Sequence, residues 1–150
     1  LKDLSMEAGK FAVDFKYVSD KNSFVQINGK GVKVGITGID RIEFLISTNA
    51  GEELRPLKKI ASGGELSRIM LAIKSVLASL DDVGTLIFDE IDSGIGGQTA
   101  FSVGKKLKKL ASDKQIICIT HLAQIASMGH VNYRVFKFEE NGRTKSNIKI

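Results

Sequence analysis

Two adjacent carboxylates, Asp89 and Glu90, follow a short and almost wholly apolar run at residues 85–88, TLIF. A run of this kind is typical of a strand that is buried on both faces of a parallel sheet. In open α/β sheets, ligands bind at the carboxyl ends of the strands, which is where these two acids stand. Solvated acids in a turn are the plainer alternative, but acids that close so apolar a strand favour a chemical role.

The two carboxylates are expected to differ in role, because adjacent residues of an extended chain point in opposite directions. One of them would hold Mg²⁺, directly or through water. The other would orient or deprotonate an attacking water.

A second candidate site is the sequence Ser62-Gly63-Gly64-Glu65, which stands directly before a run with helical spacing. Ser62 and Glu65 have the spacing of a capping box, and capping boxes alone indicate only that a helix begins. The two glycines weaken a helix by up to about 1 kcal/mol each, but they leave backbone N–H groups accessible at its positive end. Such helix ends bind phosphate, so we expect an anion site in which the Ser62 hydroxyl is a further donor.

A third candidate is His121, which follows the apolar run QIICIT at residues 115–120. This run predicts a second buried strand, so His121 would lie at the same sheet edge as Asp89 and Glu90 and could donate a hydrogen bond to a terminal phosphate. A lone histidine is more often structural, and His130, which has no such setting, is assigned no role. Cys118 lies inside the run and is interpreted as a small buried hydrophobe in a chain from a reducing compartment.

Two helices are expected to position these groups. The first is predicted by apolar residues with helical spacing at Leu66, Ile69, Met70, Ile73, Val76, Leu77 and Leu80, and the second, over residues 98–111, by a stripe of Ala100, Val103, Leu107, Leu110 and Ala111. The order helix, strand, helix, strand predicts a parallel α/β sheet. The lysines at 105, 106, 108 and 109 fall mostly off the stripe and indicate a solvated helix face, with a DNA contact as the alternative.

The remaining segments are predicted to be β-rich. Strands are expected at residues 10–18, 23–27 and 41–48, with a turn or loop at 28–38. Asn141-Gly142 predicts a hairpin between the runs at 132–138 and 144–150. We therefore expect a single domain over residues 1–150, with a β-rich part at 1–56 and an α/β part at 57–150.

The composition is that of a globular protein: 43% of the 150 residues are apolar and 26% are charged. This excludes a disordered tail. No apolar run approaches the roughly 20 residues of a membrane span, and no segment has the pattern of a signal peptide. The net charge of +5 is a weak indication of a polyanionic partner.

These motifs resemble those of ABC-type ATPases. ASGGE at 61–65 resembles the signature motif, TLIFDE at 85–90 the Walker B strand, and ITH at 119–121 the switch-histidine loop. Longer stretches, EFLISTNAGEELRPLKKIASGGELSRIMLAIK, FDEIDSGIGGQTA and CITHLAQIAS, resemble the RecN family of SMC-like, bacterial ATPases of DNA double-strand-break repair. The resemblance covers about residues 11–138 and is closest at 43–127. It implies an ABC-type head half: a parallel sheet with flanking helices, a β-rich N-terminal layer and a C-terminal hairpin.

The resemblance also implies roles for individual residues. Ser62, Gly63 and Gly64, with Glu65, would contact the γ-phosphate of an ATP that is held by an opposing subunit. Asp89 would organise Mg²⁺, Glu90 would be the catalytic base, and His121 would sense the γ-phosphate. Residues 91–96 would form the D-loop across a dimer seam, although Gly96 stands where many relatives carry aspartate.

A P-loop, G-x-x-x-x-G-K-[ST], is needed to hold the phosphates of ATP, and none of the Gly-Lys pairs in this sequence fits that pattern. The resemblance therefore implies that these residues are the C-terminal half of an ATPase head, without its P-loop lobe and coiled coil, and inactive alone. Its partners would be an N-terminal P-loop lobe, a second head in an ATP-dependent dimer, and DNA. No membrane partner is expected, and the location would be the bacterial cytoplasm, at the nucleoid.

Two other functions fit parts of the pattern. The nearest alternative is the head of another ABC-class ATPase, either an SMC-like protein or a transporter subunit, although FDEID without a following PT argues against a transporter. A non-catalytic phosphate-binding module is the alternative of a different class.

Overall fold

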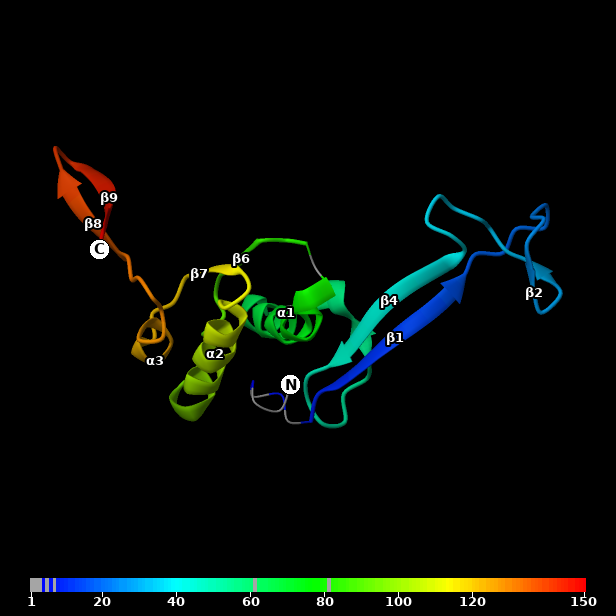
Figure 1. Cartoon of the computed structure of the whole chain (residues 1–150), viewed down its shortest axis with the longest axis horizontal. Helices are drawn as coiled ribbons and strands as arrows, with labels where there is room; N and C mark the ends of the chain where they lie inside the picture. Colours follow the sequence, from blue (N-terminus) through cyan, green and yellow to red (C-terminus); the bar gives the residue numbers. More distant parts are fainter. Residues whose placement is uncertain (1–3, 5, 7, 61, 81) are drawn as a thin grey trace. The chain divides into compact units, whose positions relative to one another are not determined.

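The computed structural model describes the chain except for residues 1–3, 5, 7, 61 and 81 (Figure 1). It consists of two compact units, Leu1–Ser62 and Gly63–Ile150. The sequence predicted a change of character after residue 56, and the observed boundary lies after Ser62, immediately before the first long helix.

The first unit is built on a long antiparallel strand pair, β1 (Lys10–Tyr17) and β4 (Asp40–Ser47), which confirms the predicted strands at 10–18 and 41–48 (Figure 1). The short strand β5 (Arg55–Pro56) adds to the other edge of β4. The η2 turn (Leu57–Lys59) follows β5. Alternate β1 residues from Phe11 to Tyr17 share one face of this sheet, as the apolar alternation of the sequence predicted. The described structure does not bury this face, because Phe11, Val13, Phe15 and Tyr17 are all exposed.

The expected strand at 23–27 is wrong over most of its length, because only β2 (Gln26–Ile27) is extended and paired, with β3 (Lys30–Gly31). A local turn occupies the preceding residues. The Ser23 amide donates to the Asp20 carbonyl oxygen at 3.2 Å, and the Asn22 amide donates to Asp20 Oδ1 at 3.0 Å. These bonds bend the chain where the apolar residues alone predicted a strand.

The second unit carries the candidate site residues from Gly63 onward. It begins with helix α1 (Gly63–Leu77) and a 3₁₀ turn, η3 (Ala78–Leu80). Strand β6 (Thr85–Phe88), helix α2 (Gly97–Leu110), strand β7 (Gln115–Cys118) and the short helix α3 (Ala123–Ala126) follow in that order (Figure 1). Strands β6 and β7 pair in parallel, from Thr85 beside Gln115 to Phe88 beside Cys118, which confirms the predicted parallel sheet.

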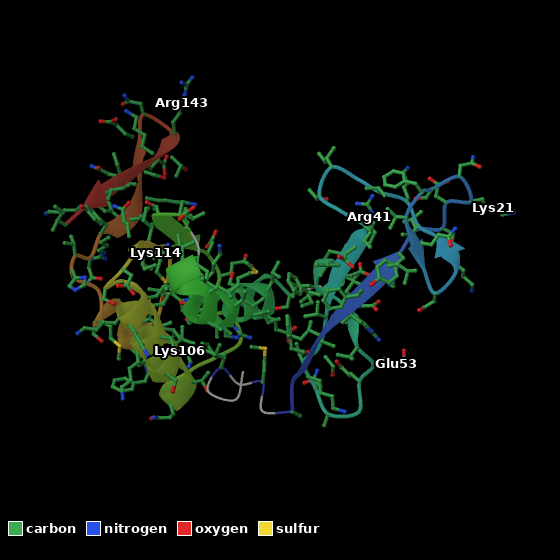
Figure 2. The ribbon with its side chains drawn as sticks, turned by 45° about the vertical axis from the view of Figure 1, so that its right-hand side comes forward. Lys21, Arg41, Glu53, Lys106, Lys114 and Arg143 are labelled. Atoms are coloured by element: carbon green, nitrogen blue, oxygen red, sulfur yellow. The ribbon has the colours of Figure 1, made fainter. Side chains whose placement is uncertain are left out.

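The core of the second unit lies on the predicted stripe of α2, whose residues Ala100, Val103, Leu107 and Leu110 are buried. The predicted stripe of α1 is only partly confirmed. Ile69 is buried, but Val76, Leu77 and Leu80 are exposed, and Leu71, which the stripe did not include, is buried instead. Three of the α2 lysines, Lys105, Lys108 and Lys109, are exposed, in agreement with a solvated helix face. Figure 2 shows Lys106 on α2 and Lys114 in the segment that leads to β7. Among the described residues, no helix is long and apolar enough to cross a membrane.

The prediction that β6 and β7 are buried on both faces is wrong. Phe88 is buried on the inner face, whereas Ile87 is 67% exposed and Ile117 is 45% exposed on the outer face. The reason is that the sheet has two strands and that the described part of this unit buries only one of its faces. The apolar composition predicted burial of both faces, but it did not indicate what would cover the second face.

The C-terminal hairpin is confirmed. Strands β8 (Arg134–Glu140) and β9 (Arg143–Lys149) are antiparallel, and Arg143 lies next to the turn that joins them (Figure 2). Asn141 and Gly142 both have positive φ angles, 55° and 71°, as a two-residue turn of type I′ requires. Nearly every residue of the hairpin is exposed.

Candidate functional site

The candidate site is centred on residues 89–93, which follow β6 and which we call the strand-end turn. The backbone leaves the extended conformation at Glu90, whose φ is +55°. The Ser93 amide then donates to the Glu90 carbonyl oxygen at 2.9 Å, which closes a turn. Asp89 supports this conformation because its Oδ1 accepts the Glu90 amide at 2.8 Å. Left-handed backbone is uncommon for a residue other than glycine, so the contacts around Glu90 must stabilise it.

Helix α1 holds the strand-end turn through two side chains. Ser67 Oγ donates to the Asp89 carbonyl oxygen at 2.7 Å. Arg68 Nη1 donates to the Ser93 carbonyl oxygen at 2.7 Å and to that of Ile91 at 3.3 Å. Arg68 is 6% exposed, and this burial lowers the pKa of its guanidinium, with the charge of Glu65 acting in the opposite direction. The beginning of α1 and the strand-end turn are therefore linked by side-chain to backbone bonds.

The two glycines of α1 lie against the same turn. A Cβ atom on Gly64 would stand 2.8 Å from the Glu90 carbonyl oxygen and 2.7 Å from Ser93 Cβ. A Cβ atom on Gly63 would collide with the carboxylate of Glu90. The glycines thus have a packing reason within the chain, besides the phosphate approach that the sequence predicted. The Glu90 carboxylate itself lies beside the first residue of α1, at the positive end of the helix.

The other two signature residues remain at the level of prediction. Ser62 is half-buried and directly precedes α1, and Glu65 lies in the first turn of the helix. Ala61, the first residue of the matched motif, lies outside the described residues. The capping box between Ser62 and Glu65 stays a prediction, as does a phosphate contact of Ser62.

His121 is tied to the strand-end turn by Asp92, a residue that the sequence reasoning did not single out. Asp92 is 4% exposed, and its Oδ2 accepts hydrogen bonds from Thr120 Oγ1 at 2.5 Å and from the His121 amide at 2.8 Å. The same oxygen lies 3.0 Å from His121 Nδ1, while the imidazole is 74% exposed. Burial opposes the charge of Asp92, but these hydrogen bonds and His121 outweigh it and lower the pKa of the carboxyl.

The only sequence signal for Asp92 was its place in the segment 91–96, which the family resemblance assigned to a D-loop. Its partners are 28 and 29 residues away, at the end of the next strand. Because β6 and β7 are parallel neighbours, their carboxyl ends meet, and this topology brings Asp92 and His121 together. The expectation that His121 lies at the same sheet edge as the carboxylates agrees with this contact.

Asp89 is the residue for which the sequence predicts a contact with Mg²⁺. Its side chain is exposed at the strand end, and one of its oxygens accepts the Glu90 amide. No group of three or more metal-binding side chains occurs in the part of the chain that the structure describes. Mg²⁺ in nucleotide sites commonly uses one or two carboxylates together with phosphate oxygens and water, so a single exposed aspartate is compatible with it.

Cys118 is not part of the candidate site. Burial, with the charges of Asp92 and Asp89, raises the pKa of its thiol to about 11. A thiol with so high a pKa is protonated at neutral pH and is a poor nucleophile. This agrees with its interpretation as a small hydrophobic residue of β7.

No family model matches the chain. It is similar to curated proteins named DNA repair protein RecN. It is 44% identical to the Bacillus subtilis protein over 99% of this chain and 26% of the relative. It is 57% identical to the Treponema pallidum protein over 76% of this chain and 20% of the relative. The chain thus spans about a quarter or less of the length of these relatives.

Solved structures of SMC heads share the fold. The Smc head domain with a coiled coil and joint from Pyrococcus yayanosii matches with a TM-score of 0.57 and 17% identity, over 97% of this chain and 24% of that structure. The Smc head domain from Pyrococcus furiosus, bound to the C-terminal domain of ScpA, matches with a TM-score of 0.54 and 16% identity, over 97% of this chain and 32% of that structure. The mixed α/β fold of a head with a parallel sheet is therefore confirmed.

Proposed function

Since the chain is RecN-like over nearly its whole length and has the fold of an SMC head, we propose that it supplies half of a composite ATP site in a DNA-repair ATPase. It would be the C-terminal lobe of a head, with both units, Leu1–Ser62 and Gly63–Ile150, in one domain. Its partners would be a P-loop lobe of the same protein, a second head, and DNA.

One observation carries this proposal: three motifs that are far apart in the sequence meet at the strand-end turn. Helix α1 reaches the turn through Ser67 and Arg68, and the end of β7 reaches it through Asp92. A group of solvated acids in a surface turn would not need a buried arginine and a buried aspartate to hold it. An arrangement that fixes the backbone around two exposed carboxylates is what positioned chemistry requires.

Glu90 would be the general base of ATP hydrolysis. Glu90 is exposed and is the second residue after β6. It would take a proton from the water whose oxygen attacks the γ-phosphorus, while the bond from that phosphorus to the bridging oxygen breaks and leaves ADP. Because the carboxylate lies against Gly63 here, Glu90 would turn away from α1 to reach this water.

Asp89 would hold Mg²⁺ on the phosphates, and the ion would supply charge neutralisation there. The Asp89 carboxylate is kept in place by the Glu90 amide, and its backbone by Ser67. Ser62, Gly63, Gly64 and Glu65 would act in trans, on the ATP of the opposing head, where the N-terminal end of α1 favours the negative γ-phosphate. His121, which follows β7, would contact the γ-phosphate of the ATP that is bound in its own head.

The test uses the complete protein that carries this chain. Glu90→Gln keeps the shape of the side chain but removes the basic oxygen, so hydrolysis should fall by about 10²- to 10⁴-fold. ATP binding should persist, and ATP-bound head dimers should accumulate in size-exclusion chromatography with light scattering. Asp89→Asn should instead weaken Mg²⁺-dependent nucleotide binding.

Glu139→Gln, a charge-matched change at an exposed site of the hairpin, is the control and should hydrolyse ATP like the wild type. Hydrolysis at the wild-type rate by Glu90→Gln would show that the base lies elsewhere. A protein that binds phosphate but hydrolyses no ATP in any variant would favour a non-catalytic phosphate-binding module.

A further inference from the structure

Asp92 has no part in the chemistry proposed above, yet it is the most enclosed acid among the described residues that surround the site. Burying a carboxylate is unfavourable unless hydrogen bonds compensate the lost water. Here three groups lie within 3.0 Å of the same oxygen, Oδ2: Thr120 Oγ1, the His121 amide nitrogen and His121 Nδ1. Every one of these groups comes from the end of β7, so Asp92 is directed at the backbone and the ring of His121.

The contact with the ring has a consequence for where the proton sits. An ionised carboxylate can only accept hydrogen bonds, and an imidazole nitrogen without hydrogen can only accept as well. The 3.0 Å approach of Asp92 Oδ2 to Nδ1 is therefore attractive only when Nδ1 carries the hydrogen. In a neutral ring the other nitrogen, Nε2, is then without hydrogen.

We propose that Asp92 is a positioning residue that holds His121 in one orientation with Nδ1 protonated and leaves Nε2 as the nitrogen that meets the ligand. This inference rests on the proposed function only for the identity of that ligand, a phosphate. It changes the simple picture of His121 as a neutral donor. While the Asp92 contact lasts, Nε2 of a neutral ring accepts a hydrogen bond, and only the imidazolium donates one to a phosphate oxygen.

Asp92 also joins two parts of the site mechanically. It fixes the His121 backbone through the amide at 2.8 Å, and it belongs to the same turn as Glu90. That turn is bonded in addition to α1 through Arg68. A displacement of His121 by a phosphate would therefore be transmitted to the turn that carries the proposed base.

The first test is spectroscopic and needs no activity. In the complete protein with ¹⁵N-labelled histidine, long-range ¹H–¹⁵N correlation distinguishes a protonated ring nitrogen from a bare one. The signal of His121 is identified by its loss in His121→Gln, and His130→Gln serves as the control. The neutral His121 ring should show Nδ1 protonated and Nε2 bare. If the spectrum of the wild-type protein shows that Nδ1 of the neutral His121 ring is unprotonated, the proposal is wrong, and no Asp92 variant is needed to reach that conclusion.

The second test separates positioning from folding. Asp92→Asn keeps the size of the side chain but removes its charge, so the preference of His121 for hydrogen at Nδ1 should weaken and the form protonated at Nε2 should gain population. ATP turnover should show a kcat that is about tenfold to a hundredfold lower, with KM for ATP near the wild-type value. Asp113→Asn, a matched change at an exposed acid, should leave the spectrum and both constants unchanged.

The double variant Asp92→Asn with His121→Gln decides whether Asp92 acts through the histidine. If it does, the double variant is no slower than His121→Gln alone, because the effects of coupled residues do not add. Additive losses, or a wild-type kcat in Asp92→Asn beside a slow His121→Gln, overturn this inference and leave the proposed function intact. Full turnover in His121→Gln removes the histidine from the proposed function, while the spectrum still tests the Asp92 contact.

Discussion

The same two strands, β6 and β7, present two contrasting regions. Their carboxyl ends lead into a set of short hydrogen bonds, in which Arg68 and Asp92 are buried and hold the strand-end turn. Their outer face carries large apolar side chains that are exposed, with Ile87 67% exposed and Ile117 45% exposed. The polar end is held together by contacts within the second unit, whereas the described part of that unit leaves the apolar face exposed.

The difference indicates which contacts this chain makes by itself and which contacts the rest of the proposed head would have to supply. The groups that would do chemistry depend on exact placement, and contacts inside this chain supply that placement. The outer face depends on burial, which any well-fitting apolar surface can supply, and we propose that the P-loop lobe is that surface. Changes at the strand-end turn should therefore affect the stability of this chain by itself and the activity of the complete protein. Changes on the outer face should matter only when the rest of the head is present.

The largest effect is expected from Ser62→Arg in the complete protein. The arginine side chain would fill the proposed phosphate-binding site at the N-terminal end of α1, so the ATP-dependent association of two heads should fail. Loss of one stabilising donor at a transition state reduces turnover by roughly 10²- to 10³-fold, and we expect a fall of at least that order. ATP binding by a single head should persist, as measured by calorimetric titration with Mg-ATP.

Ser146→Arg, which adds the same bulk and charge at an exposed site of β9, is the control and should hydrolyse ATP normally. If Ser62→Arg prevents ATP binding to monomeric heads, the motif belongs to the nucleotide of its own head.

A smaller effect, on stability, is expected from Gly64→Ala. The added Cβ would stand 2.8 Å from the Glu90 carbonyl oxygen, a backbone atom that cannot move without opening the turn. Overpacking of this kind costs about 1–3 kcal/mol in the free energy of unfolding, measured by urea denaturation of this chain. Gly84→Ala is the matched control because its Cβ would have no neighbour within 4 Å. Equal stabilities of the two variants would show that α1 does not pack on the strand-end turn as described.

The smallest effect in this chain is expected from Ile87→Thr on the outer face. Substitutions at exposed sites are usually within about 0.5 kcal/mol of neutral, and Ile87 is 67% exposed. In the complete protein the same change should cost more, since a covered isoleucine loses apolar burial. The comparison of urea denaturation in the two proteins measures the difference. The same small cost in both would mean that no lobe covers this face.

Several periodic segments of the sequence were predicted well. Helix α2 with its stripe, strand β1 and the Asn141-Gly142 turn each depend on local spacing, and local spacing is what a sequence displays directly. The spacing also predicted helix α1, but not which of its residues are buried, because Val76, Leu77 and Leu80 are exposed. The order of elements was sufficient for the parallel pairing of β6 with β7, and thus for the edge at which Asp89, Glu90 and His121 stand.

What the sequence did not reveal depends on contacts between distant residues. The role of Asp92 arises from Thr120 and His121 at the end of another strand. The tight approach of Gly64 to Glu90 supplies a reason for that glycine which no spacing rule contains. The left-handed backbone of Glu90 also invalidates the argument that Asp89 and Glu90 simply alternate along an extended strand. Their different roles now rest on the turn between them.

The central claim is that the signature residues act on the ATP of the opposing head while Glu90 acts on the ATP of its own. The claim needs a direct test because, within this chain, the Glu90 carboxylate lies beside Gly63 of the signature. The decisive measurement mixes two inactive variants of the complete protein, Glu90→Gln and Ser62→Arg, and follows ATP hydrolysis.

In a mixed two-fold dimer, one site would combine both defects and the other would combine an intact base with an intact signature. Equal mixing makes about half of the dimers mixed, with one of two sites working, so about a quarter of the wild-type rate should return. If the signature served the ATP of its own head, each head of a mixed dimer would carry one defect in its own site. Hydrolysis would then stay at the level of the separate variants, and that result would contradict the account.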